Sequence, residues 1–369
     1  MEPQNRESLH YLALWHLERN NFGLARQYFA GLVVIQCNDP SVWLSFAIVC
    51  AIDGEIHEAH QALAEVAKLV PKPEEDLRIK FCQGLLCERR HKHKEAMDLY
   101  YHSIEQCELK QGQEEGRIEE AVAAGEVDSE NAAIKREAFY RELKLEILLR
   151  VALVKKDRGE SGDAIVILDL IARESPPPSR ELRANALCLR GVMAEMQSNY
   201  SHAQRLYAEV IELVPQHSTA LERLGRVYLR YRECIPSAVS CFFRAIESNP
   251  CSSVSWYLLG RCYTATAQYT EAREAYSRAI NIDPNDAQVW CSLGILYYAH
   301  GQYDESEGLF ERALRVDPTM AEAWYNLGAL CSVRKDQAGA DNAYAKARAF
   351  GLSQRLLRTG LVLTGEGEG

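Results

Sequence analysis

The sequence predicts an all-α protein, a right-handed superhelical solenoid built from helix-turn-helix repeats. The first observation is the spacing of Trp256, Trp290 and Trp324, which follow one another at intervals of 34 residues. The second is that a Leu-Gly pair begins three residues after each tryptophan. The third is composition: hydrophobic residues make up 47% and charged residues 25%, a balance typical of a folded soluble chain. A constant period that carries the same residue types indicates a stack of similar helix pairs.

Further positions recur when each unit is numbered from three residues before its tryptophan. The seventh and eighth places are Leu-Gly, the twentieth is small, the twenty-fourth is aromatic and the twenty-seventh is Ala. The residues in the three units are Leu259-Gly260, Leu293-Gly294 and Leu327-Gly328; Ala272, Ser306 and Ala340; Tyr276, Phe310 and Tyr344; and Ala279, Ala313 and Ala347. The tryptophan and leucine share one face of the first helix, and the glycine lets the second helix cross closely. Pro284 and Pro318 end the second helix. This period and pattern are those of the tetratricopeptide repeat (TPR).

The repeats fall into a regular C-terminal array and looser N-terminal copies. Five regular units are predicted without a gap over 184–354, at 184–217, 218–252, 253–286, 287–320 and 321–354. Residues 1–110 contain degenerate units at 6–39, 40–73 and 77–110, and residues 135–183 contain one more at 145–178 followed by a Pro-rich break. The sequence therefore predicts about nine units.

Three segments interrupt or end the array. Residues 111–134 are rich in acidic residues and glycine, which predicts a solvated insert or linker. The structural alternative is a long helix extension followed by a mobile stretch, and the functional alternative is an acidic regulatory segment. Pro176-Pro177-Pro178 indicates a rigid turn between repeats. Residues 355–369 are expected to continue a short capping helix over 353–363 and then to form a disordered tail.

Charge and targeting signals exclude several classes of protein. The net charge of −10 argues against direct binding to nucleic acid, which needs clustered Lys and Arg. No secretory signal and no membrane-spanning run is evident, so a soluble intracellular protein is expected, without a membrane partner. The twelve cysteines include no CxxC pair and lie mostly in apolar surroundings, which favours buried thiols over disulfides.

No catalytic, cofactor-binding or metal-binding motif stands out. Cys82, Cys87, His91 and His93 are close in sequence, but their spacing matches no common zinc site. Phosphate-binding loops, nucleophile elbows and kinase signatures are not found. We therefore expect no cofactor, no metal and no enzymatic activity.

The predicted binding surface is the groove lined by the first helix of each C-terminal repeat. Its expected residues are Arg226, Tyr257, Leu258, Arg261, Cys291, Ile295, Tyr298, Tyr325 and Asn326. An aromatic and apolar groove with a basic edge suits an amphipathic helix or an extended peptide of a partner protein. The alternative is that some of these side chains pack between repeats, because half-buried aromatics look the same in sequence.

A family resemblance is carried by three C-terminal strings. They are Trp256-Tyr257-Leu258-Leu259-Gly260-Arg261, Trp290-Cys291-Ser292-Leu293-Gly294 with Leu296-Tyr297-Tyr298, and Trp324-Tyr325-Asn326-Leu327-Gly328. They resemble the last repeats of the TPR subunit of the fungal general transcriptional corepressor and of UTX-type histone demethylases. The resemblance covers roughly residues 218–351.

The resemblance implies a nuclear, corepressor-like scaffold that bridges DNA-bound regulators to a WD40-repeat corepressor or to chromatin regulators. Both a nuclear and a cytoplasmic location are open on the residues alone, and the resemblance favours the nucleus. The alternative is a structural TPR subunit of another assembly, of the ubiquitin-ligase, trafficking or co-chaperone type. The co-chaperone clamp needs Lys, Asn and Arg at places that here hold mainly Tyr, Cys, Leu and Ile.

Overall fold

A computed structural model describes residues 6–18, 21–73, 76–124, 126–174, 177–231 and 234–351. Within these ranges the chain forms eighteen helices and no strand, which confirms the predicted all-α class. The chain divides into two compact units, Met1–Ala220 and Leu221–Gly369. In each unit, consecutive helices pack against one another as hairpins.

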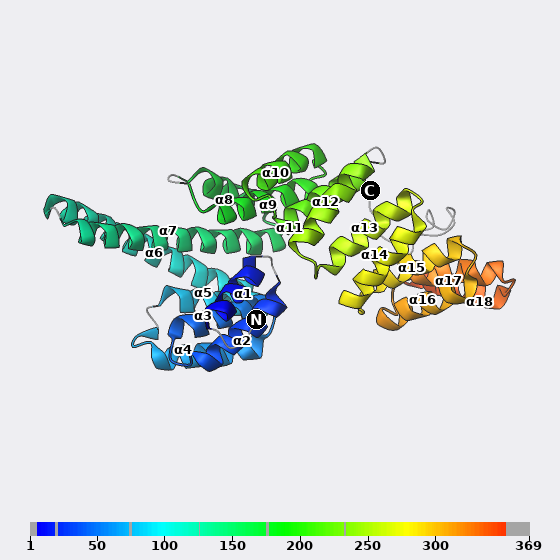
Figure 1. Ribbon diagram of the computed structural model, residues 1–369, viewed down its shortest axis with the longest axis horizontal. Helices are drawn as coiled ribbons and strands as arrows, with labels where there is room; N and C mark the ends of the chain where they lie inside the picture. Colours follow the sequence, from blue (N-terminus) through cyan, green and yellow to red (C-terminus); the bar gives the residue numbers. More distant parts are fainter. Residues whose placement is uncertain are drawn as a thin grey trace. The chain divides into compact units, whose positions relative to one another are not determined.

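The first unit contains ten helices and the start of an eleventh (Figure 1). They are α1 (Arg6–Glu18), α2 (Phe22–Ile35), α3 (Pro40–Asp53), α4 (Ile56–Leu69), α5 (Leu77–Arg89), α6 (His93–Ala124), α7 (Val127–Asp157), α8 (Ser161–Arg173), α9 (Arg180–Met196), α10 (Tyr200–Leu213) and α11 (Ser218–Leu229). The second unit takes the rest of α11 and seven further helices. These are α12 (Ile235–Ser248), α13 (Ser253–Ala265), α14 (Tyr269–Ile282), α15 (Ala287–Ala299), α16 (Tyr303–Val316), α17 (Ala321–Val333) and α18 (Gln337–Ala349).

The helix ends follow the 34-residue period. Helices α13, α15 and α17 begin at the first residues of the predicted units 253–286, 287–320 and 321–354. Ser252 and Asp286 cap two of them, because their side chains accept hydrogen bonds from the amides of Ser255 and Gln288.

In seven repeats the turn between the two helices places the fifteenth residue in the left-handed region; in the repeats 6–39 and 218–252 that residue lies outside the described residues. These residues are Gly54 (φ 97°), His91 (58°), Gly159 (81°), Ser198 (58°), Ala267 (58°), Gly301 (72°) and Lys335 (64°). Glycine adopts this conformation without a steric cost, whereas the other four residues adopt it against their preference. The same turn is therefore formed in regular and degenerate units alike.

Six hairpins are closed by a glycine at the eighth place of one helix and an aromatic ring on the next, whereas the repeats that begin at residues 6, 40 and 145 have Ala13, Ala47 and Ala152 at that place. The pairs are Gly84 with Tyr100, Gly191 with Tyr207, Gly225 with Phe242, Gly260 with Tyr276, Gly294 with Phe310 and Gly328 with Tyr344. A β-carbon at any of these glycines would lie between 2.4 and 2.8 Å from the nearest ring carbon. In these six hairpins the eighth place therefore has to be glycine, as the pattern predicted for the regular repeats.

Among the described residues, the acidic segment 111–134 is largely helical and is not an extended loop: 111–124 belong to α6 and 127–134 to α7. Helices α6 and α7 are 32 and 31 residues long and pack side by side as a hairpin (Figure 1). The buried carboxylate of Glu114 on α6 pairs with Nε of Arg136 on α7 at 3.0 Å, and with Nη1 of Arg117 on its own helix at 2.5 Å. Gly112 and Gly116 have open space around them, so neither forces a break. Most acidic residues lie on the solvent side, where their charge does not oppose helix formation.

Two predicted features fall at least partly outside the described residues. The capping helix over 353–363 and the tail to residue 369 lie wholly outside them. Of the proline run, Pro177 and Pro178 are described and belong to no helix.

Candidate protein-binding surfaces

The structure separates the nine predicted groove residues into two groups. Six are buried, and their relative exposures are 7% or less: Tyr257, Leu258, Cys291, Ile295, Tyr325 and Asn326. Arg226 is exposed, and Arg261 and Tyr298 are half-buried. The alternative of packing between helices therefore holds for the six, and a partner can reach only the other three without rearrangement.

The six buried side chains pack against neighbouring helices and do not line an open groove. The rings of Tyr257 and Tyr325 lie against Tyr276 and Tyr344, with centroid distances of 6.1 and 5.2 Å. The side-chain amide of Asn326 donates to Sγ of Cys291 across 3.5 Å. Burial raises the pKa of the Cys291 thiol to about 12, so this cysteine is a packing residue and not a nucleophile.

The three accessible residues lie on successive first helices of the second unit, α11, α13 and α15. The guanidinium of Arg261 lies 6.0 Å from the ring centroid of Tyr257. Tyr298 contacts Tyr303 edge-on, with centroids 5.4 Å apart. Burial, followed by the neighbouring Tyr303, raises the pKa of Tyr298, so its hydroxyl stays a neutral hydrogen-bond donor. Two arginines and a tyrosine of this kind suit the contact surface of a partner protein.

The repeat tryptophans are fixed by two contacts that sequence reasoning missed. The indole Nε1 groups of Trp256, Trp290 and Trp324 donate to the carbonyls of Pro250, Pro284 and Pro318, at 3.2, 2.8 and 2.9 Å. The second contact is a cation from the following helix, at the twenty-sixth place of the unit. Arg278, Arg312 and Lys346 lie 5.0, 5.6 and 4.0 Å from the three ring centroids. The signal was present, because these cations repeat every 34 residues like the tryptophans.

Trp43, in the N-terminal unit 40–73, keeps the hydrogen bond, but among the described residues no cation lies over its ring. Its Nε1 donates to the Cys37 carbonyl at 2.8 Å. The twenty-sixth place of this unit is Glu65, whose carboxylate pairs with Lys68 on the same helix at 2.6 Å. Trp43 and Glu65 instead line an open hollow.

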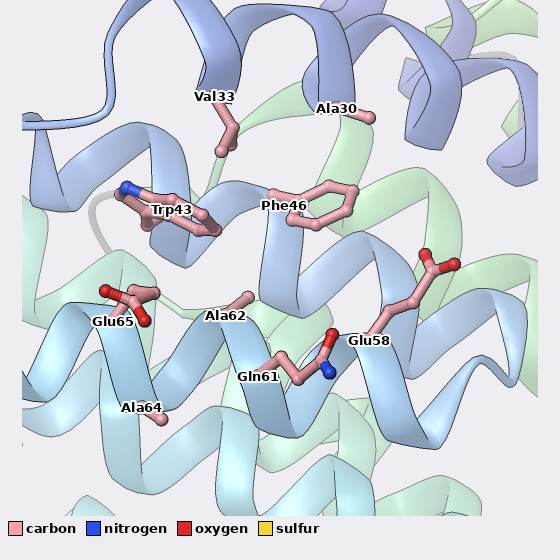
Figure 2. Close-up of a pocket in the computed structure, with 9 residues that line it drawn as sticks. All are labelled: Ala30, Val33, Trp43, Phe46, Glu58, Gln61, Ala62, Ala64 and Glu65. Atoms are coloured by element: carbon pink, nitrogen blue, oxygen red, sulfur yellow. The ribbon is translucent and has the colours of Figure 1, made fainter.

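This hollow, the Trp43 groove, has a volume of about 610 Å³ and lies among α2, α3 and α4. Trp43 and Phe46 form its centre, α2 contributes Ala30 and Val33, and α4 contributes its lower side (Figure 2). The residues from α4 are Glu58, Gln61, Ala62, Ala64 and Glu65. The groove is thus apolar along its middle and acidic towards both ends.

The acidic character of the groove continues beyond Glu58. Arg26 pairs with Asp53 at 2.9 Å, with Glu58 at 3.1 Å and with Glu55 at 3.8 Å. Three carboxylates therefore share one guanidinium, and the surface keeps an excess of negative charge. The side chains of Glu58 and Glu65 are 43% and 42% exposed, so both remain available to a ligand.

A smaller hollow of about 170 Å³ lies in the second unit, between the start of α14 and the end of α15. Tyr269 and His300 meet there edge-on, with ring centroids 4.5 Å apart. Its dimensions suit one small side chain rather than a peptide.

The cysteine and histidine group considered for a metal is dispersed. Burial raises the pKa of Cys82 to about 12, and the rings of His91 and His93 lie 6.0 Å apart. Across the residues that the structure covers, no three His, Cys, Asp or Glu side chains form a group that could hold a metal ion. In the same residues, no helix is both long and apolar enough to span a membrane.

Two family profiles match parts of the chain. The profile for the C-terminal domain of cilia and flagella-associated protein 70 matches residues 168–317, which is less than half of the chain. A tetratricopeptide-repeat profile matches residues 291–351. No curated protein matches significantly.

Several solved TPR structures are similar at low identity. A tetratricopeptide repeat protein from Parabacteroides merdae is 15% identical, with a TM-score of 0.46 and coverage of 69% of this chain and 98% of that one. YrrB, described as a TPR protein with an unusual peptide-binding site, is 22% identical, with a TM-score of 0.38 and coverage of 47% and 89%. MamA from Desulfovibrio magneticus is 20% identical, with a TM-score of 0.41 and coverage of 48% and 96%. The profile matches and the repeated hairpins together show TPR-type repeats within residues 168–351.

Proposed function

We propose that this chain is a non-catalytic scaffold that bridges components of a nuclear, corepressor-like transcription-regulatory complex. The observation that carries the binding role is the row of Arg226, Arg261 and Tyr298 on three successive first helices of the second unit. Side chains with a large contact area and charge-assisted hydrogen bonds contribute strongly to protein interfaces. The proposed partners are protein segments, including a WD40-repeat corepressor or chromatin regulators.

The nuclear context is supported by the family resemblance of the strings that begin at Trp256, Trp290 and Trp324. Those strings supply both the repeat packing and the accessible Arg261 and Tyr298.

Affinity purification of the tagged full chain from cells tests this proposal. WD40 corepressors or histone-modifying enzymes should be recovered, and a double variant Arg226→Glu with Arg261→Glu should reduce their recovery about tenfold or more, because both cations are replaced by anions. A matched variant, Arg205→Glu with Arg273→Glu, makes the same charge change on other exposed helix positions and should leave recovery unchanged. Recovery that is equal with both variants would contradict the binding role of this row.

A second candidate is a structural subunit of a ciliary or flagellar assembly. The observation that favours it is the profile match over residues 168–317 to the C-terminal domain of cilia and flagella-associated protein 70. Imaging of the tagged chain in ciliated cells separates the two candidates. Signal along the cilium, with axonemal proteins in the purified material, supports the second, whereas nuclear signal supports the first.

A further inference from the structure

Four repeats of the chain carry a tryptophan at the fourth place, and for one of them, Trp43, no cation in the described part of the chain covers the indole ring. In the three C-terminal units a basic side chain from the second helix lies over the indole ring, at 4.0 to 5.6 Å from its centroid. In the unit 40–73 the same place is Glu65, and the space beside Trp43 is a groove of about 610 Å³. An indole ring is the side chain that binds cations best through its π face.

The groove also matches a basic ligand in its remaining walls. Glu65 lies towards the Trp43 end and Glu58 towards the other end, with Phe46 and Ala62 between them (Figure 2). Carboxylates beside an aromatic face attract the same cation that the ring attracts, and the apolar middle excludes water from an aliphatic side chain. The volume is in the range of pockets that hold several side chains of a ligand.

We propose that the Trp43 groove binds a basic amphipathic helix of a partner protein, whose Arg or Lys side chain occupies the place that Arg278, Arg312 and Lys346 occupy over their own tryptophans. The cation lies between Trp43 and Glu65, an apolar side chain lies on Phe46, and a second basic residue pairs with Glu58. This inference rests on the proposed scaffold function and adds a second binding site, in the first unit.

The positions of the two glutamates set the spacing of the ligand. Glu58 and Glu65 are seven residues apart on α4, which corresponds to about 10 Å at 1.5 Å per residue. A bound helix that runs along α4 therefore presents basic residues two turns apart, with apolar residues on the same face at the third and fourth positions between them.

Fluorescence anisotropy with the full-length chain tests the site. The probe is a labelled helical peptide of about 18 residues, with arginine at two positions seven apart and leucine at the third and fourth positions after the first arginine. The wild-type chain should bind it, and added salt should weaken binding. A peptide in which both arginines are glutamate should bind about tenfold more weakly or not at all.

The sharpest variant is Glu65→Arg, which gives the unit 40–73 the same covering cation as the C-terminal units. Peptide binding should fall about tenfold or more, while the melting temperature should be unchanged or higher. The control Glu274→Arg makes the same charge change at an exposed position of α14 and should leave binding unchanged. Undiminished binding to Glu65→Arg, or an equal loss in the control, would overturn the proposal.

Two other occupants give distinct results. If light scattering shows a wild-type dimer and a Glu65→Arg monomer, the groove holds a second copy of this chain. If removal of residues 352–369 increases peptide affinity about tenfold, the groove holds the chain's own C-terminal segment. Either result overturns the partner helix as occupant. Loss of peptide binding in Glu65→Arg with normal partner recovery through Arg226 and Arg261 separates this site from the main proposal.

Discussion

The tryptophan at the fourth place has different surroundings in the N-terminal repeat 40–73 and in the three C-terminal repeats. Trp256, Trp290 and Trp324 are each hydrogen-bonded through the indole nitrogen and covered by a cation of their own chain. Trp43 has the hydrogen bond and a groove in place of the cation. The residue 22 positions after the tryptophan therefore sets its role. A basic residue at that place covers the indole ring, whereas Glu65 leaves the ring of Trp43 beside an open groove.

The largest expected effect is a loss of stability at high pH, and it arises from buried thiols that both compact units contain. Burial raises the pKa of Cys50 and Cys82 in the first unit, and of Cys262 and Cys291 in the second, from 9.0 to about 12 each. The pKa of each thiol is higher in the folded chain than in the unfolded chain. The stability that the protonated thiols contribute is therefore complete below pH 9 and is lost as the pH rises towards 12. At pH 10 each thiol should lower the free energy of unfolding by about 1 kcal/mol, and the four together should lower it by about 4 kcal/mol.

Urea unfolding at pH 8, 9 and 10 measures this loss. A Cys291→Ala variant should show a smaller loss between pH 8 and 10 than the wild-type chain. An identical pH profile for the two proteins would show that the Cys291 thiol is not linked to folding.

The next effect concerns the hairpin contact that both regions also share. Gly260→Ala should lower the free energy of unfolding by about 2–3 kcal/mol, because its β-carbon would meet the Tyr276 ring at 2.6 Å. Gly84→Ala should do the same in the first unit, against Tyr100. Gly308→Ala, on α16 with open space around it, is the control and should be neutral or stabilising. Denaturant titration measures all three, and equal effects at Gly260 and Gly308 would contradict the close packing.

The contact that differs between the regions should have a smaller effect. Arg312→Ala removes the cation over Trp290 and should cost about 0.5–1 kcal/mol, the usual size for an exposed cation–π pair. Glu65→Ala, at the same place of the N-terminal unit, should change stability by less than this, since its salt bridge to Lys68 is exposed. Thermal unfolding compares the two variants; equal losses would mean that the covering cation has no special role.

The smallest effect tests the turn at the fifteenth place. Ala267→Gly should stabilise the chain by about 0.5–1 kcal/mol, because Ala267 has a φ of 58° whereas Gly301 fills the same place in the next unit. Ala345→Gly, at an exposed position inside α18, should lower stability by a similar amount. A fall in melting temperature with Ala267→Gly would show that the left-handed turn is not strained.

Much of the fold could be predicted, because glycine, tryptophan and proline each recur for a local reason. The close approach at Gly260 and the end of α14 near Pro284 follow from backbone sterics alone. The segment 111–134 could not be predicted in the same way, since its helices depend on pairing with each other through Glu114 and Arg136. Charge excess and three glycines do not reveal that partner.

The binding surface was harder to predict than the fold. The positions of Tyr257 and Tyr325 within their repeats predicted that both line a groove. Whether such a ring is covered depends on the size of its neighbours on the next helix. The Trp43 groove was within reach of the sequence, by comparing Glu65 with Arg278, Arg312 and Lys346. The nuclear location and the identity of the partner stay predictions.

The hydrogen bond from each tryptophan to the loop six residues earlier has a consequence for how such an array can change length. Trp290 and Trp324 find the same acceptor, a proline carbonyl, at the same offset. Removal or duplication of one whole repeat would place a tryptophan after an equivalent loop, so the hydrogen bond at the new junction would form as before. A break that falls between the proline and the tryptophan keeps this bond only when the removed or added length is a whole number of repeats. The chemistry of one side chain thus favours growth and loss of the array by whole repeats.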